Sequence, residues 1–319
     1  MYFVFLSVLF LIIMVCVLSV RLLDKRIFIE SINPDVSDRV VLEMNEKYKP
    51  PRLKQSKVRL GIICMTKQPI AFSSWLAHHR HDMNVEHFFI CVEDTPFLTQ
   101  WLETTAPWSE CVSVWNSTGT QAYFSQMDRQ SAHVRQSIVE ARQRGLTHVL
   151  HIDDDELLFC PSGRNLFHNH LMNMNADTVT LRNIEAVYEK EDCKNPFKTA
   201  TTFSVHPTEF SAYVNGKSIG CLAHSNLEPD GPHLFNGRRK IIPSYIAVIA
   251  HYESSCIAKW RIKFDAYAKD TPKACERNEI PFRFYCDSIE SRHPSIWQKW
   301  KTRGRHADRL LTLSIYNQF

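Results

Sequence analysis

The sequence predicts an α/β fold: a mostly parallel sheet with helices on both faces, preceded by one N-terminal transmembrane helix. Three observations lead to this prediction. From residue 58 onward, short β-rich runs alternate with stretches of helical periodicity. Two of those runs end in acidic residues, at the edge where parallel sheets bind ligands. Residues 2–20 are apolar and contain no charge, proline or glycine.

The first two predicted strands are separated by one helix and followed by another. VRLGIICM, residues 58–65, is apolar and β-rich, and EHFFICVEDT, residues 86–95, repeats this character. Between them a helical stripe is formed by Phe72, Trp75, Leu76 and His79, at spacings i, i+3, i+4 and i+7. The proline that opens PFLTQWLETT, residues 96–105, suits the first turn of a second helix.

A third and a fourth strand complete the alternation. CVSVWN, residues 111–116, and THVLHI, residues 147–152, are the strands. The helix between them, residues 126–144, carries Val134, Ile138 and Ala141 on one face and stops at Gly145. The resulting order β-α-β-α-β-α-β predicts parallel pairing with helices on both faces of the sheet.

Composition excludes several classes of protein. The chain has 319 residues, 44% hydrophobic and 23% charged, which is ordinary for a globular protein. Neither GxGxxG nor GxxxxGK(S/T) occurs, so the two commonest phosphate-binding loops are absent. A net charge of +4 without a dominant basic cluster argues against a nucleic-acid partner. The ten cysteines include no CxxC pair, which argues against a zinc knuckle and leaves the redox compartment open.

Three segments follow one another along the chain. Residues 1–27 are predicted to be a transmembrane anchor with a short tail, since a helix over residues 2–20 is about 29 Å long. Residues 28–57 are polar and contain three prolines, so they are predicted to be a stem that links the anchor to the folded part. Residues 58–319 are predicted to form the folded domain. Arg21, Lys25 and Arg26 favour a cytoplasmic domain, whereas Asn116-Ser117-Thr118 is a lumenal glycosylation pattern.

The run THVLHIDDDELLF, residues 147–159, leads an apolar strand into four consecutive acids. Neighbouring carboxylates repel one another and resist burial, so positive charge is expected beside them. If the extended strand continues, Asp153 and Asp155 point to one side and Asp154 to the other. Two carboxylates on one side suit Mg²⁺ or Mn²⁺, which commonly bind substrate phosphates. The alternative is an acidic surface turn, or a cap before a helix that starts at Glu156.

Three blocks of the sequence resemble those of a known group of enzymes. They are CMTKQPIAFSSWLAHHRHDMNVEHFFICVEDT, ARQRGLTHVLHIDDDELLF and AVIAHYESSCIAKWRIKFDAYAK, which together span residues 64–269. In this order they are similar to blocks of the GT-A glycosyltransferases, especially the family-2-like and family-92-like group of membrane-anchored sugar transferases. The middle block, similar to the group's G-x-x-W-V-L-F-I-D-x-D-E-F, is the most specific.

The resemblance implies a GT-A fold, a nucleotide-sugar donor, most simply a UDP-sugar, and a divalent metal, Mn²⁺ or Mg²⁺. By position, Asp153 and Asp155 would hold the metal that bridges the diphosphate of the donor. His233 is the candidate that completes the metal shell, with His251 as the second choice.

The resemblance also assigns the nucleotide end of the site. Asp94 would lie by the nucleoside, with Asp153 also on the donor, and Thr66 and Lys67 would line the first nucleotide loop. Two departures stand out. Gln68-Pro69 replaces the Asn-Glu of the group, and Ser255-Cys256 stands where the group has Lys-Ser, so a basic side chain is missing there.

The general base of an inverting transferase is a carboxylate near the acceptor hydroxyl. Glu185 follows the strand-like run DTVTLRNI at a suitable distance from the acidic run and is the first candidate. Glu156 and Asp230 compete with it.

These observations lead to a metal-dependent glycosyltransferase that moves a sugar from a nucleotide-sugar to a glycan or glycoconjugate hydroxyl, with inversion. The resemblance to Golgi transferases favours a type II orientation, with the membrane bound by the N-terminal helix and the domain in the Golgi or ER lumen. Two alternatives use the same features: a nucleotidyl- or phosphotransferase with the same acidic metal site, and a non-catalytic membrane-tethered binding module.

Overall fold

The computed structural model describes residues 58–119, 123–188, 193–205, 213, 215–270, 273, 275–276, 280, 282–303 and 310–312. All of these belong to one compact unit. The predicted anchor and stem lie outside this range, so they stay predictions. Within it, no helix combines the length and the apolar character that a membrane crossing requires.

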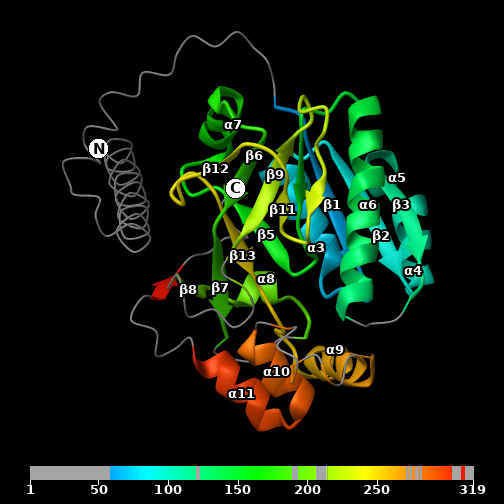
Figure 1. Cartoon of the computed structure of the whole chain (residues 1–319), viewed down its shortest axis with the longest axis vertical. Helices are drawn as coiled ribbons and strands as arrows, with labels where there is room; N and C mark the ends of the chain where they lie inside the picture. The colour runs from blue at the N-terminus through cyan, green and yellow to red at the C-terminus, as the bar shows by residue number, and fades with distance from the viewer. Residues whose placement is uncertain are drawn as a thin grey trace, which may run out of the picture. The chain divides into compact units, whose positions relative to one another are not determined.

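The largest sheet of the described chain has seven strands in the order β12-β6-β9-β4-β1-β2-β3 (Figure 1). Strand β1 pairs in parallel with β2 and β4, and β2 pairs in parallel with β3, so the predicted parallel sheet is confirmed. Strand β9 runs antiparallel between β4 and β6, and β12 lies parallel to β6. The bounds are β1 Leu60–Thr66, β2 His87–Glu93, β3 Val112–Ser117, β4 His148–His151, β6 Thr178–Leu181, β9 Lys217–Cys221 and β12 Arg239–Ile241.

Helices cover both faces of this sheet because adjacent residues of a strand point to opposite sides. Phe88 of β2 packs on Trp75 of α3, whereas Phe89 joins a buried cluster with Val134 and Ile138 of α6. Helix α6 lies along the sheet in Figure 1. The bounds are α3 Phe72–Ala77, continued by the π-helical turn η1 His78–Asp82, α4 Pro96–Thr104, α5 Trp108–Cys111 and α6 Tyr123–Gln143.

A second sheet, which the periodicity did not indicate, contains strands in the order β14-β8-β7-β13-β5. Strand β13 pairs in parallel with β7 and antiparallel with β5. The bounds are β5 Glu156–Phe159, β7 Asn183–Val187, β8 Thr202–Ser204, β13 Val248–His251 and β14 Leu310–Thr312, and a two-stranded ribbon joins β10 Pro229–Asp230 to β11 Leu234–Phe235.

The acidic run lies in a turn between the two sheets. Strand β4 ends at His151, and the backbone amide of Glu156 donates to the carbonyl of Asp153 at 3.2 Å before β5 begins. The expectation of a strand that continues through the acids is therefore wrong. The turn rotates each acid to a different side, so alternation along a strand does not decide where they point.

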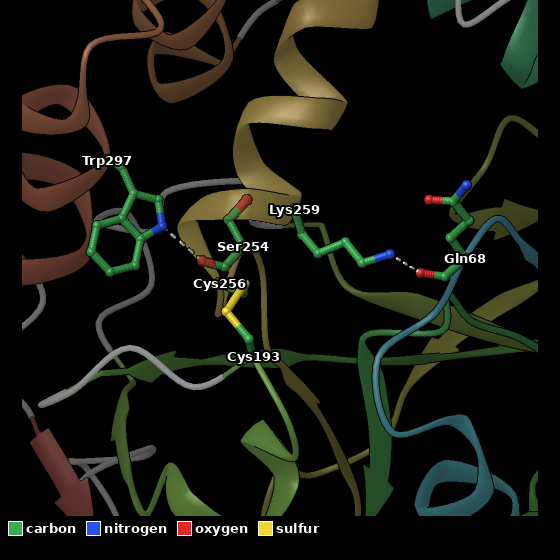
Figure 2. The surroundings of a disulfide bond; sticks show 6 residues. All are labelled: Gln68, Cys193, Ser254, Cys256, Lys259 and Trp297. Atoms are coloured by element: carbon green, nitrogen blue, oxygen red, sulfur yellow. Dashed lines mark hydrogen bonds between the residues drawn. A yellow bond between two sulfur atoms is a disulfide. The ribbon is translucent and has the colours of Figure 1, made fainter.

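The remaining helices are α7 Arg164–Asn173, α8 Pro196–Thr199, α9 Ile257–Asp270, α10 Arg283–Glu290 and α11 Pro294–Arg303. Helices α9 and α10 share a buried cluster that includes Trp260, Phe264 and Phe284. Disulfides join Cys193 to Cys256 and Cys275 to Cys286, and Figure 2 shows the first of these at the start of α9.

Candidate active site

A cavity of about 370 Å³ opens where β1, β4 and β13 end. Its walls include the loop after β1, the acidic turn, the loop after β13 and one side of α9. The polar side chains of the lining include Lys67, Gln68, residues 153–155, His251, residues 253–255, Lys259 and Lys263, together with Gln126, Gln130, Tyr213, His233 and Tyr285. Ligands of mainly parallel sheets bind at this edge, so the fold places the cavity where a substrate is expected.

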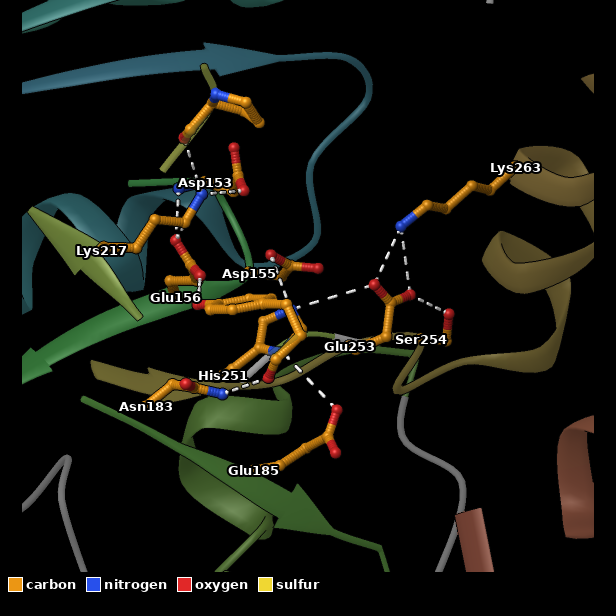
Figure 3. Close-up of polar contacts among 12 residues, drawn as sticks. Asp153, Asp155, Glu156, Asn183, Glu185, Lys217, His251, Glu253, Ser254 and Lys263 are labelled. Atoms are coloured by element: carbon orange, nitrogen blue, oxygen red, sulfur yellow. Dashed lines mark hydrogen bonds and ion pairs between the residues drawn. The ribbon is translucent and has the colours of Figure 1, made fainter. Parts of the chain in front are cut away.

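Three side chains of the cavity wall form a candidate metal group: Asp155, His251 and Glu253. Nε2 of His251 lies 3.8 Å from Oδ1 of Asp155 and 3.9 Å from Oε2 of Glu253 (Figure 3). The three ligand atoms lie within 4.8 Å of one another. His251 is the last residue of β13, and Glu253 lies two positions further on, in the turn that follows the strand.

This group fits a divalent cation. Its separations are too long for hydrogen bonds. They resemble the spacing of about 3–4 Å between ligand atoms around an ion with bonds of about 2.1 Å. One imidazole beside two carboxylates favours Mn²⁺ over Mg²⁺, which prefers an all-oxygen shell.

The charges of the group also favour a cation. Burial raises the pKa of Asp155; His251 opposes this shift and Glu253 adds to it. Burial would lower the pKa of His251, but Asp155 and the carboxylate of Glu185 outweigh burial and raise this pKa to about 9. His251 thus lies where positive charge is stabilised, whether a proton or a metal ion carries it.

Glu185 stands behind the metal group. It is the β7 neighbour of His251 across the pairing of β7 and β13, and its Oε1 lies 3.6 Å from Nδ1 of His251. The side chain of Glu185 is 7% exposed and is not part of the cavity lining. A carboxylate behind a metal-binding histidine fixes the tautomer and orientation of the ring.

Asp153 contacts a buried lysine on the other side of the turn. Nζ of Lys217, on β9, lies 2.6 Å from Oδ2 of Asp153 and 3.5 Å from Oε2 of Glu156, and the lysine side chain is 0% exposed. Although burial opposes it, Lys217 holds the pKa of Asp153 well below its usual range. The positive charge expected beside the acids is therefore supplied in part by the chain itself.

Glu156 belongs to the same buried network. It accepts hydrogen bonds from the hydroxyl of Tyr213 and, at 2.8 Å, from the backbone amide of Asp153. Burial raises the pKa of Glu156 to about 7, against the opposing effect of Lys217. Like Glu185, Glu156 is absent from the cavity lining.

The predicted nucleotide loop also lies at this edge. The hydroxyl of Thr66 donates to Asp154, whose pKa burial and the neighbouring Asp155 raise to about 7. Lys67 forms an ion pair with Asp94 at 2.7 Å, which joins the ends of β1 and β2. Lys67 lines the cavity, whereas Asp94 is exposed and is not part of the lining.

His233, the first candidate for the metal shell, lines the cavity but stands apart from the metal group. Its Nδ1 lies 3.0 Å from the carbonyl oxygen of Gly216, and its ring packs on Tyr213. Burial, helped by Lys217, lowers the pKa of His233 to about 3 and keeps the ring neutral. His251, the second candidate, belongs to the group.

Four residues of the site were missed at the level of sequence. Glu253 had a signal in its position two residues after His251. Lys259 and Lys263 had one too, since a spacing of four residues places both on the same face of α9. Lys217 had none, because only the pairing of β9 with β4 brings it beside the acidic turn.

The chain was compared with known proteins. No protein-family model matches it. Two proteins of Arabidopsis thaliana are similar: Glycosyltransferase-like At2g41451, 27% identical over 57% of this chain and 50% of that protein, and Glycosyltransferase-like At3g57200, 26% identical over 44% of this chain and 33% of that protein. The chain therefore spans half or less of the curated relatives it matches.

Solved structures give weaker similarities. HddC from Yersinia pseudotuberculosis matches 68% of this chain and 98% of its own at 12% identity and a TM-score of 0.35. The mannosyltransferase PcManGT from Pyrobaculum calidifontis, solved with GDP-Man and Mn²⁺, matches 78% of this chain and 74% of its own at 10% identity and a TM-score of 0.35. Scores this low support neither a shared fold nor a shared activity.

Proposed function

We propose that the chain is a metal-dependent glycosyltransferase that moves a sugar from a nucleotide-sugar, with UDP-sugars as the first donors to test, to a hydroxyl of a glycan or glycoconjugate. One observation carries the proposal: Asp155, His251 and Glu253 gather three metal-type ligand atoms in a cavity at the carboxyl ends of the strands. The glycosyltransferase-like relatives support sugar transfer in general.

Asp155, His251 and Glu253 would hold the metal, with Mn²⁺ preferred and Mg²⁺ as the alternative. When bound, the ion supplies positive charge that stabilises the departing nucleoside diphosphate. Lys263 contacts Glu253 with its Nζ 2.9 Å from Oε2 and 3.2 Å from Oε1, and so holds that carboxylate in place. Glu185 orients the ring of His251 from behind.

Lys259 supplies the basic group that the closing block lacks at Ser255. It lies one helical turn before Lys263 on α9, lines the cavity and donates to the backbone carbonyl of Gln68. A lysine has three donors, so Lys259 keeps capacity for the phosphates of a donor. The diphosphate would then lie between the metal group and Lys259, with the nucleoside towards Lys67 and Asp94.

Glu185 and Glu156 are the predicted candidates for the catalytic base, and neither lines the cavity. Their contacts suit them to orient His251 and to hold the acidic turn. Inversion at the anomeric carbon therefore rests on the sequence resemblance alone.

Turnover of a panel of nucleotide-sugars, with Mn²⁺ and with excess EDTA, tests the proposed function. We expect donor cleavage or transfer only in the presence of the metal. Asp155→Asn should lower turnover by about 100-fold or more, because the ion that stabilises charge on the diphosphate loses one of its ligands. Asp265→Asn is the control, since the side chain of Asp265 is 65% exposed and does not line the cavity. Undiminished turnover in EDTA, or an active Asp155→Asn, would contradict the proposal.

We also propose that the domain lies in the lumen of the Golgi or ER, behind a type II membrane anchor. Two disulfides occur among the described residues, and disulfides persist in oxidising compartments. Asn116 is exposed at the end of β3, an edge strand of the main sheet, and is open to a glycosyltransferase of the lumen. An Asn116-dependent mass shift that an N-glycosidase removes would support this orientation, and its absence together with reduced cysteines would contradict it.

A further inference from the structure

The disulfide between Cys193 and Cys256 joins two walls of the cavity. Pro196 and Phe197 line the cavity three and four residues after Cys193. On the other side, residues 253–255 precede Cys256, and Lys259 follows it by less than one helical turn (Figure 2). The crosslink therefore lies behind the lining on both sides, between segments that are 63 residues apart in sequence.

Further hydrogen bonds hold the segment from Glu253 to Lys259. Nε1 of Trp297, on α11, donates to the carbonyl of Ser254 at 2.9 Å, as Figure 2 shows. Lys259 donates to the carbonyl of Gln68 across the cavity. Lys263 grips the carboxylate of Glu253 from α9.

The backbone of this segment is strained at Ser254, whose φ is 50°. A non-glycine residue in the left-handed region is disfavoured and persists only where its surroundings determine the conformation. Ser254 follows the metal-group residue Glu253 directly and precedes Cys256 by two positions. Ser254 therefore keeps this conformation only while the surrounding contacts hold the segment, and Glu253 is its direct neighbour.

We propose that the Cys193–Cys256 crosslink positions Glu253 for the metal and Lys259 for the donor diphosphate. The two cysteines are positioning residues, because neither contacts the cavity in the described chain. This inference rests on the proposed function of the site. It adds that ligand binding, and not only the stability of the fold, depends on one particular disulfide.

The second disulfide offers a matched control. Cys275 and Cys286 are 11 residues apart and close a short loop between α9 and α10. Cys286 lies within α10, whose Phe284 and Ile289 are buried against Trp260 and Phe264 of α9. Tyr285 lines the cavity and contacts Glu253 at 3.1 Å, and we expect the helix packing to hold Tyr285 in place without the crosslink.

The experiment compares Cys193→Ser/Cys256→Ser with Cys275→Ser/Cys286→Ser, both made in the same oxidising host as the wild type. The affinity for Mn²⁺ alone is measured from the spin-resonance signal of the free ion, and that for UDP by calorimetry in Mn²⁺. We expect the first variant to lose about tenfold or more in both affinities, as when a group that orients metal ligands is removed. The second variant should keep both.

Folding and ligand binding are separated by a readout that needs no ligand. Hydrogen exchange of the backbone amides of residues 253–259 should be faster in the first variant than in the wild type, and unchanged in the second. If Cys193→Ser/Cys256→Ser does not fold, the wild type is mildly reduced and alkylated at the accessible Cys193, and the same measurements follow after the reagents are removed.

The outcomes distinguish the two proposals. A folded first variant with wild-type affinity for Mn²⁺ and UDP overturns the positioning role. Equal losses in both double variants also overturn it, because the effect would then be general. If the wild type binds neither Mn²⁺ nor UDP, the proposed function fails. Unchanged hydrogen exchange of residues 253–259 in the first variant would separately overturn the positioning role of the crosslink.

Discussion

The two sheets of the molecule contribute differently to the site. In the seven-stranded sheet, β1, β2, β3 and β4 follow one another along the chain with helices between them, and their residues form a scaffold. In the second sheet, β5, β7 and β13 bring together Glu156, Glu185 and His251, which are far apart in sequence. Segments with clear local periodicity therefore form the scaffold, whereas pairing between distant strands brings the candidate site residues together.

The largest effect is expected where the two sheets meet. Replacing the buried lysine, Lys217→Met, leaves Asp153 and Glu156 without their cation and should lower the free energy of unfolding by about 3–5 kcal/mol. Lys240→Met, at an exposed position on β12, is the control. Denaturant unfolding measures both variants, and a loss no larger than that of the control would show that the turn does not depend on Lys217.

Acid should weaken the seven-stranded sheet through His133 of α6. Burial lowers the pKa of His133 to about 4, from 6.5 for an unperturbed histidine, so the unfolded chain binds the proton more readily. The stability from the neutral ring is complete above pH 6.5 and is lost as the pH falls to about 4, on the order of 3 kcal/mol. The stability of the wild type relative to His133→Leu should therefore fall by on the order of 3 kcal/mol between pH 6.5 and 4; a difference that does not change with pH would contradict this.

Glu185→Gln separates a positioning role from a catalytic one. If Glu185 orients His251, the affinity for Mn²⁺ falls by about 10- to 100-fold, and saturating metal restores most of the turnover. If Glu185 is the general base, the affinity for Mn²⁺ is unchanged and kcat falls at every metal concentration. Metal titration of the turnover rate distinguishes these results.

The smallest effect is expected in the scaffold. Ile138→Val removes one methylene group from the cluster between α6 and the sheet and should cost about 0.5–1.5 kcal/mol of stability. Because this cluster lies away from the candidate metal group, the affinity for Mn²⁺ should not change. A change in that affinity would show that the first sheet tunes the site as well as supporting it.

The same contrast explains what the sequence predicted. The helix over residues 126–144 is observed as α6, Tyr123–Gln143, because Val134, Ile138 and Ala141 repeat at helical spacing. Asp155, predicted as a metal ligand from side-chain alternation and from the resemblance of its block, belongs to the candidate metal group, although the strand does not continue to it. The first four strands and their helices follow from such local patterns.

Sequence reasoning did less well where distant segments meet. It preferred His233 to His251 for the metal shell, because a histidine by itself does not show which strand it will lie beside. The pairing of β13 with β5 and β7 decides that point. A site role for Lys217 could not be predicted for the same reason, because a single lysine in β9 gives no local sequence pattern.

The turn between β4 and β5 has one more consequence. Three successive acids each contact a different segment: Asp153 meets Lys217, Asp154 meets Thr66, and Asp155 faces His251. A ligand that displaces this turn would therefore change contacts of β9, of the end of β1 and of the end of β13 together, although no two of these strands are neighbours along the chain.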